Sequence, residues 1–228
     1  MKTLRVAQIA KMIDHSLLSP QMTREEVAEG CELALAYHTA SVCVRGYDVE
    51  FCVEKLRESD ILVGTVVGFP HGNSTVETKV FETKDAIKKG AGEIDVVMPI
   101  GLVRSGLYNR VQEELKAVHD VCKTKSIPLK VIFENAYLDQ GEIIACCRIC
   151  DALQVDFIKT STGFAASGAL AEDVKLMKEH VRDSIRIKAA GGIRTYEQFL
   201  TLYELGASRF GTSATKAILE EARAKGLF

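Results

Sequence analysis

Short runs of apolar, often β-branched residues alternate along the chain with longer segments in which apolar residues recur at helical spacing. The runs are candidate strands, and the segments between them, roughly ten to twenty residues long, are candidate helices. Eight strands are expected, at 12–16, 40–44, 62–67, 93–98, 129–133, 156–160, 185–189 and 208–211. This alternation is typical of βαβ units and a parallel sheet.

The segments between the strands carry helix start signals. Apolar residues repeat with a period of 3.6 over 27–35 and 111–122, and a further helix is expected over 3–11, before the first strand. The pattern predicts an α/β protein with one domain, a single (β/α)8 TIM barrel over 1–228 with an extra N-terminal helix; an open doubly wound sheet is the alternative. Three capping-box pairs mark helix starts: Thr23 with Glu26, Ser74 with Glu77, and Thr195 with Gln198.

Three charged residues interrupt the expected strands. Asp95 lies in the fourth, and Lys159 and Lys188 lie near the ends of the sixth and seventh. Strands in both folds are buried on two faces, so a charge within one is informative. Their neighbours are apolar and should face the helices, so a period of two directs the charged side chains inward. Chemistry in both folds sits at the carboxyl ends of the strands.

Lysines on adjacent strands would lie close together. Burial and a like charge both disfavour the ammonium form, so the pKa of at least one lysine should fall. A neutral lysine attacks carbonyl carbon, and an aspartate can hold the second lysine charged and transfer protons. Lys159, Lys188 and Asp95 are therefore candidate catalytic residues for Schiff-base chemistry. The alternative is a structural ion network in which one lysine extends to solvent.

Glycine-bearing loops follow the last three strands. Barrels often bind phosphate with the loops after strands seven and eight and a helix N-terminus, where glycines let backbone amides approach phosphate oxygens. The alternative is that these residues form only tight turns and a helix cap. Asp14 and Cys43 lie at expected strand ends. Together these positions make up the expected binding site for a small phosphorylated substrate: Asp14, Cys43, Thr162, Gly191, Gly192, Gly211 and Ser213.

The overall charge limits the classes of partner. A formal net charge of -2 argues against a large basic surface for nucleic acid or for an anionic membrane. No apolar run is long enough to span a bilayer, and the N-terminal segment lacks a secretory pattern, so a cytoplasmic protein with free thiols is expected. Cys146, Cys147 and Cys150 are interpreted as part of a buried stripe, because four-ligand zinc spacing is absent; no metal or cofactor is expected.

The chain resembles the deoxyribose-phosphate aldolase family along nearly its whole length. The segments around Lys159 and Lys188 are the most specific part of this resemblance. The matching segments occur in the family's order: 13–18, 41–44, 66–70, 92–97, 130–134, 156–164, 187–195 and 206–213.

The resemblance implies a (β/α)8 class I aldolase without a metal, which reversibly cleaves 2-deoxy-D-ribose 5-phosphate to acetaldehyde and D-glyceraldehyde 3-phosphate. Lys159 matches the Schiff-base lysine, Lys188 the lysine that lowers its pKa, and Asp95 the aspartate of the proton relay. The family works in the cytoplasm in deoxynucleoside breakdown, commonly as a homodimer. The positions that match its phosphate and substrate contacts are Gly191, Gly192, Ser213 and Cys43.

Several positions depart from the family pattern and bear on substrate breadth, phosphate affinity and proton transfer. They leave open two alternatives: a related phosphosugar aldolase or isomerase, and a non-catalytic phosphosugar-binding barrel. The chain ends without the terminal tyrosine that assists proton transfer in some members. The departures are Ser16, Ser19, His71, Asn135, Ala136, 165–167, Ala190 and the ending Gly226-Leu227-Phe228.

Overall fold

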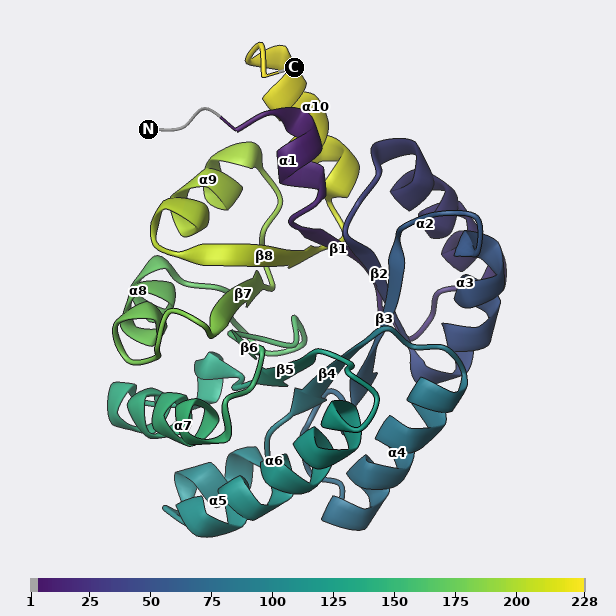
Figure 1. The fold of residues 1–228 in the computed structure, drawn as a ribbon. Helices are drawn as coiled ribbons and strands as arrows, with labels where there is room; N and C mark the ends of the chain where they lie inside the picture. Colours follow the sequence, from purple (N-terminus) through teal and green to yellow (C-terminus); the bar gives the residue numbers. More distant parts are fainter. Residues whose placement is uncertain (1–3, 228) are drawn as a thin grey trace.

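A computed structural model describes residues 4–227, in which eight parallel strands form a closed barrel in sequence order (Figure 1). β8 pairs with β1 and closes the sheet, so the (β/α)8 barrel is confirmed and the open doubly wound sheet is excluded. The strands are β1 Ile13–Leu17, β2 Ser41–Val44, β3 Leu62–Val67, β4 Glu93–Val97, β5 Leu129–Ile132, β6 Phe157–Lys159, β7 Arg186–Ala190 and β8 Ala207–Thr212.

Helices surround the barrel (Figure 1). The expected extra N-terminal helix is present as α1, which is shorter than 3–11 and packs against α10; residue 3 lies outside the described residues. The α-helices are α1 Val6–Ala10, α2 Arg24–Tyr37, α3 Val49–Leu56, α4 Val76–Lys88, α5 Ile100–Arg104, α6 Tyr108–Lys123, α7 Gln140–Leu153, α8 Ala171–Glu179, α9 Tyr196–Glu204 and α10 Thr215–Ala224. Short 3₁₀ helices occupy Gly46–Asp48 and Asn135–Tyr137.

Two of the three expected capping boxes are confirmed. Thr23 caps α2 and Thr195 caps α9, each with the reciprocal bond from the third helical residue. The third expectation, Ser74 with Glu77, is wrong by one residue. The extended backbone of Thr75 makes that residue the cap of α4, and its hydroxyl accepts the hydrogen bond of the Thr78 amide.

The core lies between the strands and the helices, and a second, polar core fills the barrel. Ile94 and Val96 of β4, Ile158 of β6 and Ile187 of β7 belong to the apolar core, as the strand periodicity predicts. The alternate residues point inward. In the barrel register Lys159 pairs with Lys188, which places the two expected catalytic lysines side by side on neighbouring strands.

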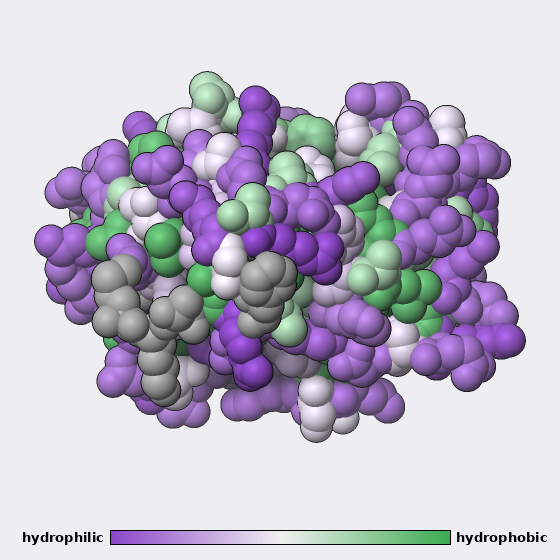
Figure 2. All heavy atoms as spheres, turned by 90° about the horizontal axis from the view of Figure 1, so that it is seen from above, coloured by the Kyte–Doolittle hydropathy of each residue, from purple (hydrophilic) through white to green (hydrophobic). Residues whose placement is uncertain are grey.

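The outer surface is predominantly hydrophilic on the face shown in Figure 2, with separate apolar patches. Large exposed apolar side chains include Tyr47, Phe81 and Tyr137, which come from different parts of the chain. Among residues 4–227, no helix is both long enough and apolar enough to cross a bilayer.

Candidate active site

Asp95 lies at the centre of a cluster of charges inside the barrel. Its Oδ2 accepts hydrogen bonds from the Nζ of Lys159, at 2.7 Å, and of Lys188, at 2.8 Å. Its Oδ1 accepts a third, from the Nζ of Lys130 at 2.8 Å. Asp95 is fully buried, and none of the three lysines is more than 2% exposed. One carboxylate from β4 therefore holds lysines from β5, β6 and β7.

A second set of ion pairs surrounds this centre. Lys188 Nζ lies 2.5 Å from Asp14 Oδ2, and Lys130 Nζ lies 2.9 Å from Glu93 Oε2. Arg209, on β8, binds both of these carboxylates: its Nε donates to Asp14, and its Nη2 contacts the Glu93 carboxylate at 2.8 Å. Lys188 and Lys130 each contact two carboxylates within 3 Å, whereas Lys159 contacts only that of Asp95.

This arrangement separates the pKa values of the lysines. Burial lowers the pKa of Lys159, the nearby Lys188 lowers it further, and Asp95 compensates only in part. Burial acts in the same direction on Lys188, but the charges of Asp14 and Asp95 outweigh it and raise the pKa of Lys188. Burial alone would raise the pKa of Asp95, but three ammonium groups hold that pKa well below its usual value. Lys159 is thus the lysine whose neutral form is favoured.

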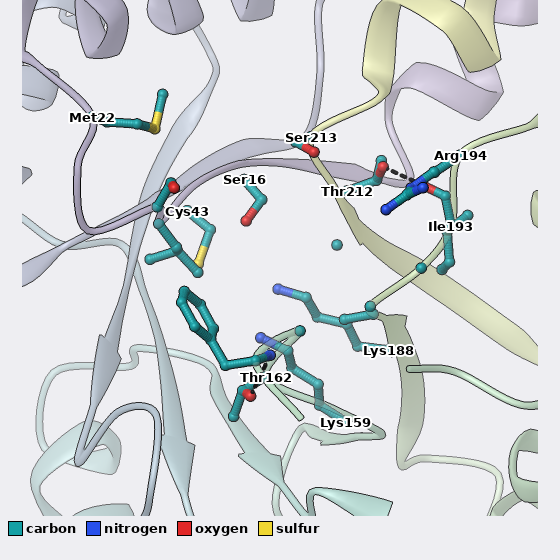
Figure 3. Close-up of a pocket in the computed structure, with 18 residues that line it drawn as sticks. Ser16, Met22, Cys43, Lys159, Thr162, Lys188, Ile193, Arg194, Thr212 and Ser213 are labelled. Carbon is teal, nitrogen blue, oxygen red and sulfur yellow. Dashed lines mark hydrogen bonds between the residues drawn. The ribbon is translucent and has the colours of Figure 1, made fainter. Parts of the chain in front are cut away.

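Both lysines open into a pocket at the carboxyl ends of the strands (Figure 3). Its volume is about 490 Å³, within the usual range for small-ligand sites. In Figure 3 the side chains of Lys159 and Lys188 project into the hollow from neighbouring strands, and Cys43 and Ser16 lie across from them. The expected binding residues that line this pocket are Cys43, Thr162, Gly191, Gly192, Gly211 and Ser213.

The loop after β7 needs its glycines. Gly191 and Gly192 have φ of 85° and 76°, in the left-handed region that favours glycine. A Cβ at Gly191 would lie 2.9 Å from the Cα of Gly168, so the neighbouring loop also demands a small residue there. Thr212 joins this loop to the one after β8, because its hydroxyl donates to the carbonyl oxygen of Ile193 at 2.6 Å (Figure 3). These contacts hold the pocket wall in which phosphate binding is expected.

The loop after β6 is held by a buried carboxylate. Glu134 has φ of 57°, an unusual conformation for a residue with a side chain. Its carboxylate accepts hydrogen bonds from the hydroxyl and the backbone amide of Thr162. The Thr162 hydroxyl in turn accepts the amide of Phe164 at 3.1 Å. Phe164 lines the pocket and packs edge-on against Phe69, with ring centroids 5.4 Å apart.

Asp14, predicted among the substrate-binding residues, does not line the pocket. It is fully buried below Lys188, and its Oδ1 accepts hydrogen bonds from Ser41 and Arg209. The inward-facing side of β1 places this carboxylate among the charges inside the barrel, so its contacts are with protein groups. Its neighbour His15 packs away from the site, where its Nδ1 lies 2.9 Å from the Thr215 hydroxyl.

Some of the departures from the family pattern line the pocket, and others lie elsewhere in the structure. Ser16, Ser19 and Ala190 line the pocket. His71 lines a separate hollow beside α4, and Ala136 lines another beside α5. Asn135 is buried, and its Nδ2 donates to the sulfur of Met177 at 3.5 Å. The chain's last residue lies outside the described residues.

Lys130, Glu93 and Arg209 are the site residues for which the sequence yielded no role. All three are charged residues within barrel strands, the same signal that identified the three catalytic candidates. Applied to every strand, that rule would have found them. The spacing along the chain does not show which carboxylate each cation contacts.

The cysteines form the buried stripe that was expected on α7. Cys146, Cys147 and Cys150 are fully buried free thiols. Burial raises the pKa of Cys147 to about 12 and also raises those of Cys146 and Cys150, so these thiols stay neutral. No group of three or more His, Cys, Asp or Glu side chains within residues 4–227 is arranged to hold a metal ion.

Residues 8–226 match the family model described as DeoC/LacD family aldolase. The chain belongs to this aldolase family. The deoxyribose-phosphate aldolase of Caldanaerobacter subterraneus subsp. tengcongensis is 47% identical to this aldolase over 220 residues, which are 96% of this chain and 95% of the relative. The "Deoxyribose-phosphate aldolase 2" of Staphylococcus aureus strain COL is also 47% identical, over 92% of this chain and 95% of the relative.

Solved structures agree with the fold of this aldolase. The structure described as QR15, an aldolase, superposes with a TM-score of 0.90 at 36% identity and covers 96% of this chain and 97% of its own. The tetrameric deoxyribose phosphate aldolase of Aeropyrum pernix also has a TM-score of 0.90, at 25% identity, over 96% of this chain and 93% of its own. The protein is therefore a lyase of the aldolase type built on a (β/α)8 barrel.

Proposed function

We propose that the protein cleaves 2-deoxy-D-ribose 5-phosphate reversibly to acetaldehyde and D-glyceraldehyde 3-phosphate through a Schiff base on Lys159. One observation carries the proposal: a buried lysine with a lowered pKa opens into a pocket beside a second lysine that stays charged. The family membership and the names of the relatives support the choice of substrate.

The first half of the reaction uses the neutral Lys159. Its Nζ lone pair attacks the C1 aldehyde carbon of the open-chain sugar, and the carbonyl oxygen takes up a proton. Loss of water then leaves a protonated imine. The charged Lys188 can deliver protons to the departing oxygen, and Asp95, which contacts both Nζ atoms, can accept and return them.

The second half breaks the C2–C3 bond. A base removes the proton of the C3 hydroxyl, the C2–C3 electron pair moves toward the imine, and D-glyceraldehyde 3-phosphate leaves behind an enamine. Protonation of the enamine at C2 and hydrolysis of the imine release acetaldehyde and restore the amine. We assign these proton transfers to the group formed by Lys188 and Asp95, because both lie beside the Lys159 nitrogen.

The other end of the sugar is assigned to the loops after β6, β7 and β8. Gly191, Gly192, Gly211 and Ser213 line the pocket wall, where backbone amides and a hydroxyl are suited to phosphate oxygens. Thr162 and Cys43 line the wall nearer the lysines. Burial raises the pKa of Cys43, so its thiol stays neutral and offers the substrate a small, weakly polar surface.

Reductive trapping tests the proposal directly. The protein is incubated with acetaldehyde and borohydride, digested, and read by mass spectrometry; we expect an ethyl adduct on Lys159. Lys159→Ala should abolish cleavage of 2-deoxyribose 5-phosphate while the circular dichroism spectrum is retained. Lys178→Ala, at a surface ion pair with Asp183, is the matched control and should react normally. A fully active Lys159→Ala variant, or an adduct only elsewhere, would refute the assignment.

The substrate is tested separately from the nucleophile. We expect cleavage of 2-deoxyribose 5-phosphate and little turnover of ribose 5-phosphate. A preference for the ribose sugar would favour the alternative of a related phosphosugar enzyme. An ethyl adduct on Lys159 without cleavage of either sugar would indicate an aldolase whose acceptor aldehyde is not D-glyceraldehyde 3-phosphate.

We also propose that the enzyme works in the cytoplasm, in deoxynucleoside breakdown, as a homodimer. The family resemblance supports this proposal. The related structure from Aeropyrum pernix is described as a tetramer, so a tetramer is the alternative assembly. Light scattering coupled to size-exclusion chromatography distinguishes the two: a mass near 50 kDa supports the dimer, twice the chain's 25.0 kDa.

A further inference from the structure

The cluster inside the barrel holds more cations than anions. Four basic side chains, from β5, β6, β7 and β8, surround three carboxylates, from β1 and β4. All seven side chains are nearly or fully buried, the most exposed being Arg209 at 12%. A buried surplus charge is costly, so the cluster favours the loss of one proton. The members are Lys130, Lys159, Lys188, Arg209, Asp14, Glu93 and Asp95.

The contacts decide which cation gives up the proton. Arg209 cannot, because a guanidinium stays protonated in proteins. Lys188 and Lys130 are each held by two carboxylates, at 2.5 and 2.8 Å and at 2.9 and 2.8 Å. Lys159 has one carboxylate, at 2.7 Å, which it shares with the other lysines. Deprotonation of Lys159 therefore sacrifices fewer favourable contacts with carboxylates than deprotonation of Lys130 or Lys188.

We propose that Arg209 is a positioning residue of this aldolase, whose permanent charge, carried through Asp14 and Glu93, obliges Lys159 to be the neutral lysine. Without Arg209, three lysines would match three carboxylates, and each lysine could keep its proton. Arg209 does not line the pocket, so it acts through the carboxylates and not on substrate. The inference rests on the proposed role of Lys159 as nucleophile.

The remaining titratable groups near Lys159 do not change this balance. Cys43, on β2, stays a neutral thiol because burial raises its pKa. His15, on β1, stays neutral near pH 7, since burial lowers its pKa to about 4. Four further charged residues lie at the edges of the barrel. Arg186 is exposed at the start of β7 and stacks on Phe157; the others are Asp156 beside it, Arg194 at the exposed pocket rim, and Glu134, whose carboxylate is occupied by Thr162.

The test compares a variant that loses one positive charge with a variant that loses one positive and one negative charge. Arg209→Met should move the acidic limb of the kcat/KM profile for 2-deoxyribose 5-phosphate upward by about one pH unit or more. Below that limb, the rate then falls about tenfold. Adding Glu93→Gln to Arg209→Met removes one carboxylate, restores the surplus cation, and should return the limb toward the wild-type position. Arg209→Lys keeps the charge and should leave the limb near wild type.

A merely structural role would give a different pattern. In that case, removing the Glu93 carboxylate as well would not bring the acidic limb back, so a double variant whose limb lies as high as that of Arg209→Met overturns the proposal. An unmoved limb in Arg209→Met overturns it too. Where Arg209→Met fails to fold by circular dichroism, Glu93→Gln and Arg209→Lys decide: an upward shift in either refutes the charge-balance account.

The trapping experiment separates this inference from the proposed function. The pH dependence of ethyl-adduct formation on Lys159, in acetaldehyde and cyanoborohydride, should shift in parallel with the kcat/KM profile in each variant. Wild-type protein that forms no adduct on Lys159 contradicts the proposed function itself. Wild-type protein that forms the adduct, with an Arg209→Met profile that does not move, contradicts only the role of Arg209.

Discussion

Replacing Lys188 by methionine should raise the pKa of its neighbour Lys159. Lys159 and Lys188 both contact Oδ2 of Asp95, at 2.7 and 2.8 Å, so their nitrogens lie no more than about 5.5 Å apart. Two unit charges at that separation repel by about 3 kcal/mol at an effective dielectric constant of about 20. Removing this repulsion, in Lys188→Met, should raise the pKa of Lys159 by about two units.

The assay is the pH dependence of kcat/KM for cleavage of 2-deoxyribose 5-phosphate. The acidic limb should move upward by about two pH units in Lys188→Met, so the rate below the limb falls about a hundredfold. Loss of proton transfer by Lys188 lowers the plateau as well, but a lower plateau does not move the limb. The position of the limb therefore reports the electrostatic effect alone.

Lys178→Met is the matched control, because Lys178 pairs with Asp183 on the surface and lies outside the barrel. Its profile should coincide with that of the wild type. An acidic limb in Lys188→Met within a few tenths of a unit of the wild type would refute the reasoning. That outcome would mean that the charge of Lys188 does not govern the protonation of Lys159.

Two other changes test the loops and the buried histidine. Gly191→Ala places a Cβ where φ is 85° and where the Cα of Gly168 lies 2.9 Å away. We expect KM for 2-deoxyribose 5-phosphate to rise about tenfold, or ~1.4 kcal/mol, with trapping of acetaldehyde unchanged; Gly101→Ala, in open space on α5, is the control. His15 has a pKa lowered by burial from 6.5 to about 4, so it contributes stability above pH 6.5 that is lost as the pH falls. Urea unfolding should show a loss of about 3 kcal/mol between pH 6.5 and 4 that is smaller in His15→Gln; equal pH slopes would contradict this.

The barrel could be predicted from the sequence because its strands are short apolar runs at regular intervals. The period of two in 93–98 predicts that Asp95 points into the barrel, and the structure confirms it. The prediction that Lys159 and Lys188 lie close together follows from the adjacency of their strands, and their pairing across β6 and β7 confirms it. The sequence pattern does not fix the first residue of each helix. Ser74 and Thr75 are both good caps, and only the backbone conformation at Thr75 decides between them.

The partners of each charge could not be predicted. Asp14 lies at the end of an expected strand, as binding residues often do, but its side chain contacts Lys188 and Arg209 instead of the pocket. Which ions meet depends on the tilt and register of eight strands closed into a ring. The conformation of Glu134 and its bonds to Thr162 depend likewise on the folded loop.

The pairing of Lys159 with Lys188 across β6 and β7 has a consequence for how this enzyme can change over evolutionary time. Lys159, the proposed nucleophile, and Lys188 lie on paired strands of the sheet, whereas the pocket wall proposed to bind the sugar comes from the loops that follow. Insertions and substitutions accumulate in loops at little thermodynamic cost. New aldehydes can therefore be admitted by altering 162–164 or 191–194 while the reactive amine stays in place. The residues proposed to determine reactivity and those proposed to determine selectivity therefore lie on separate parts of the chain.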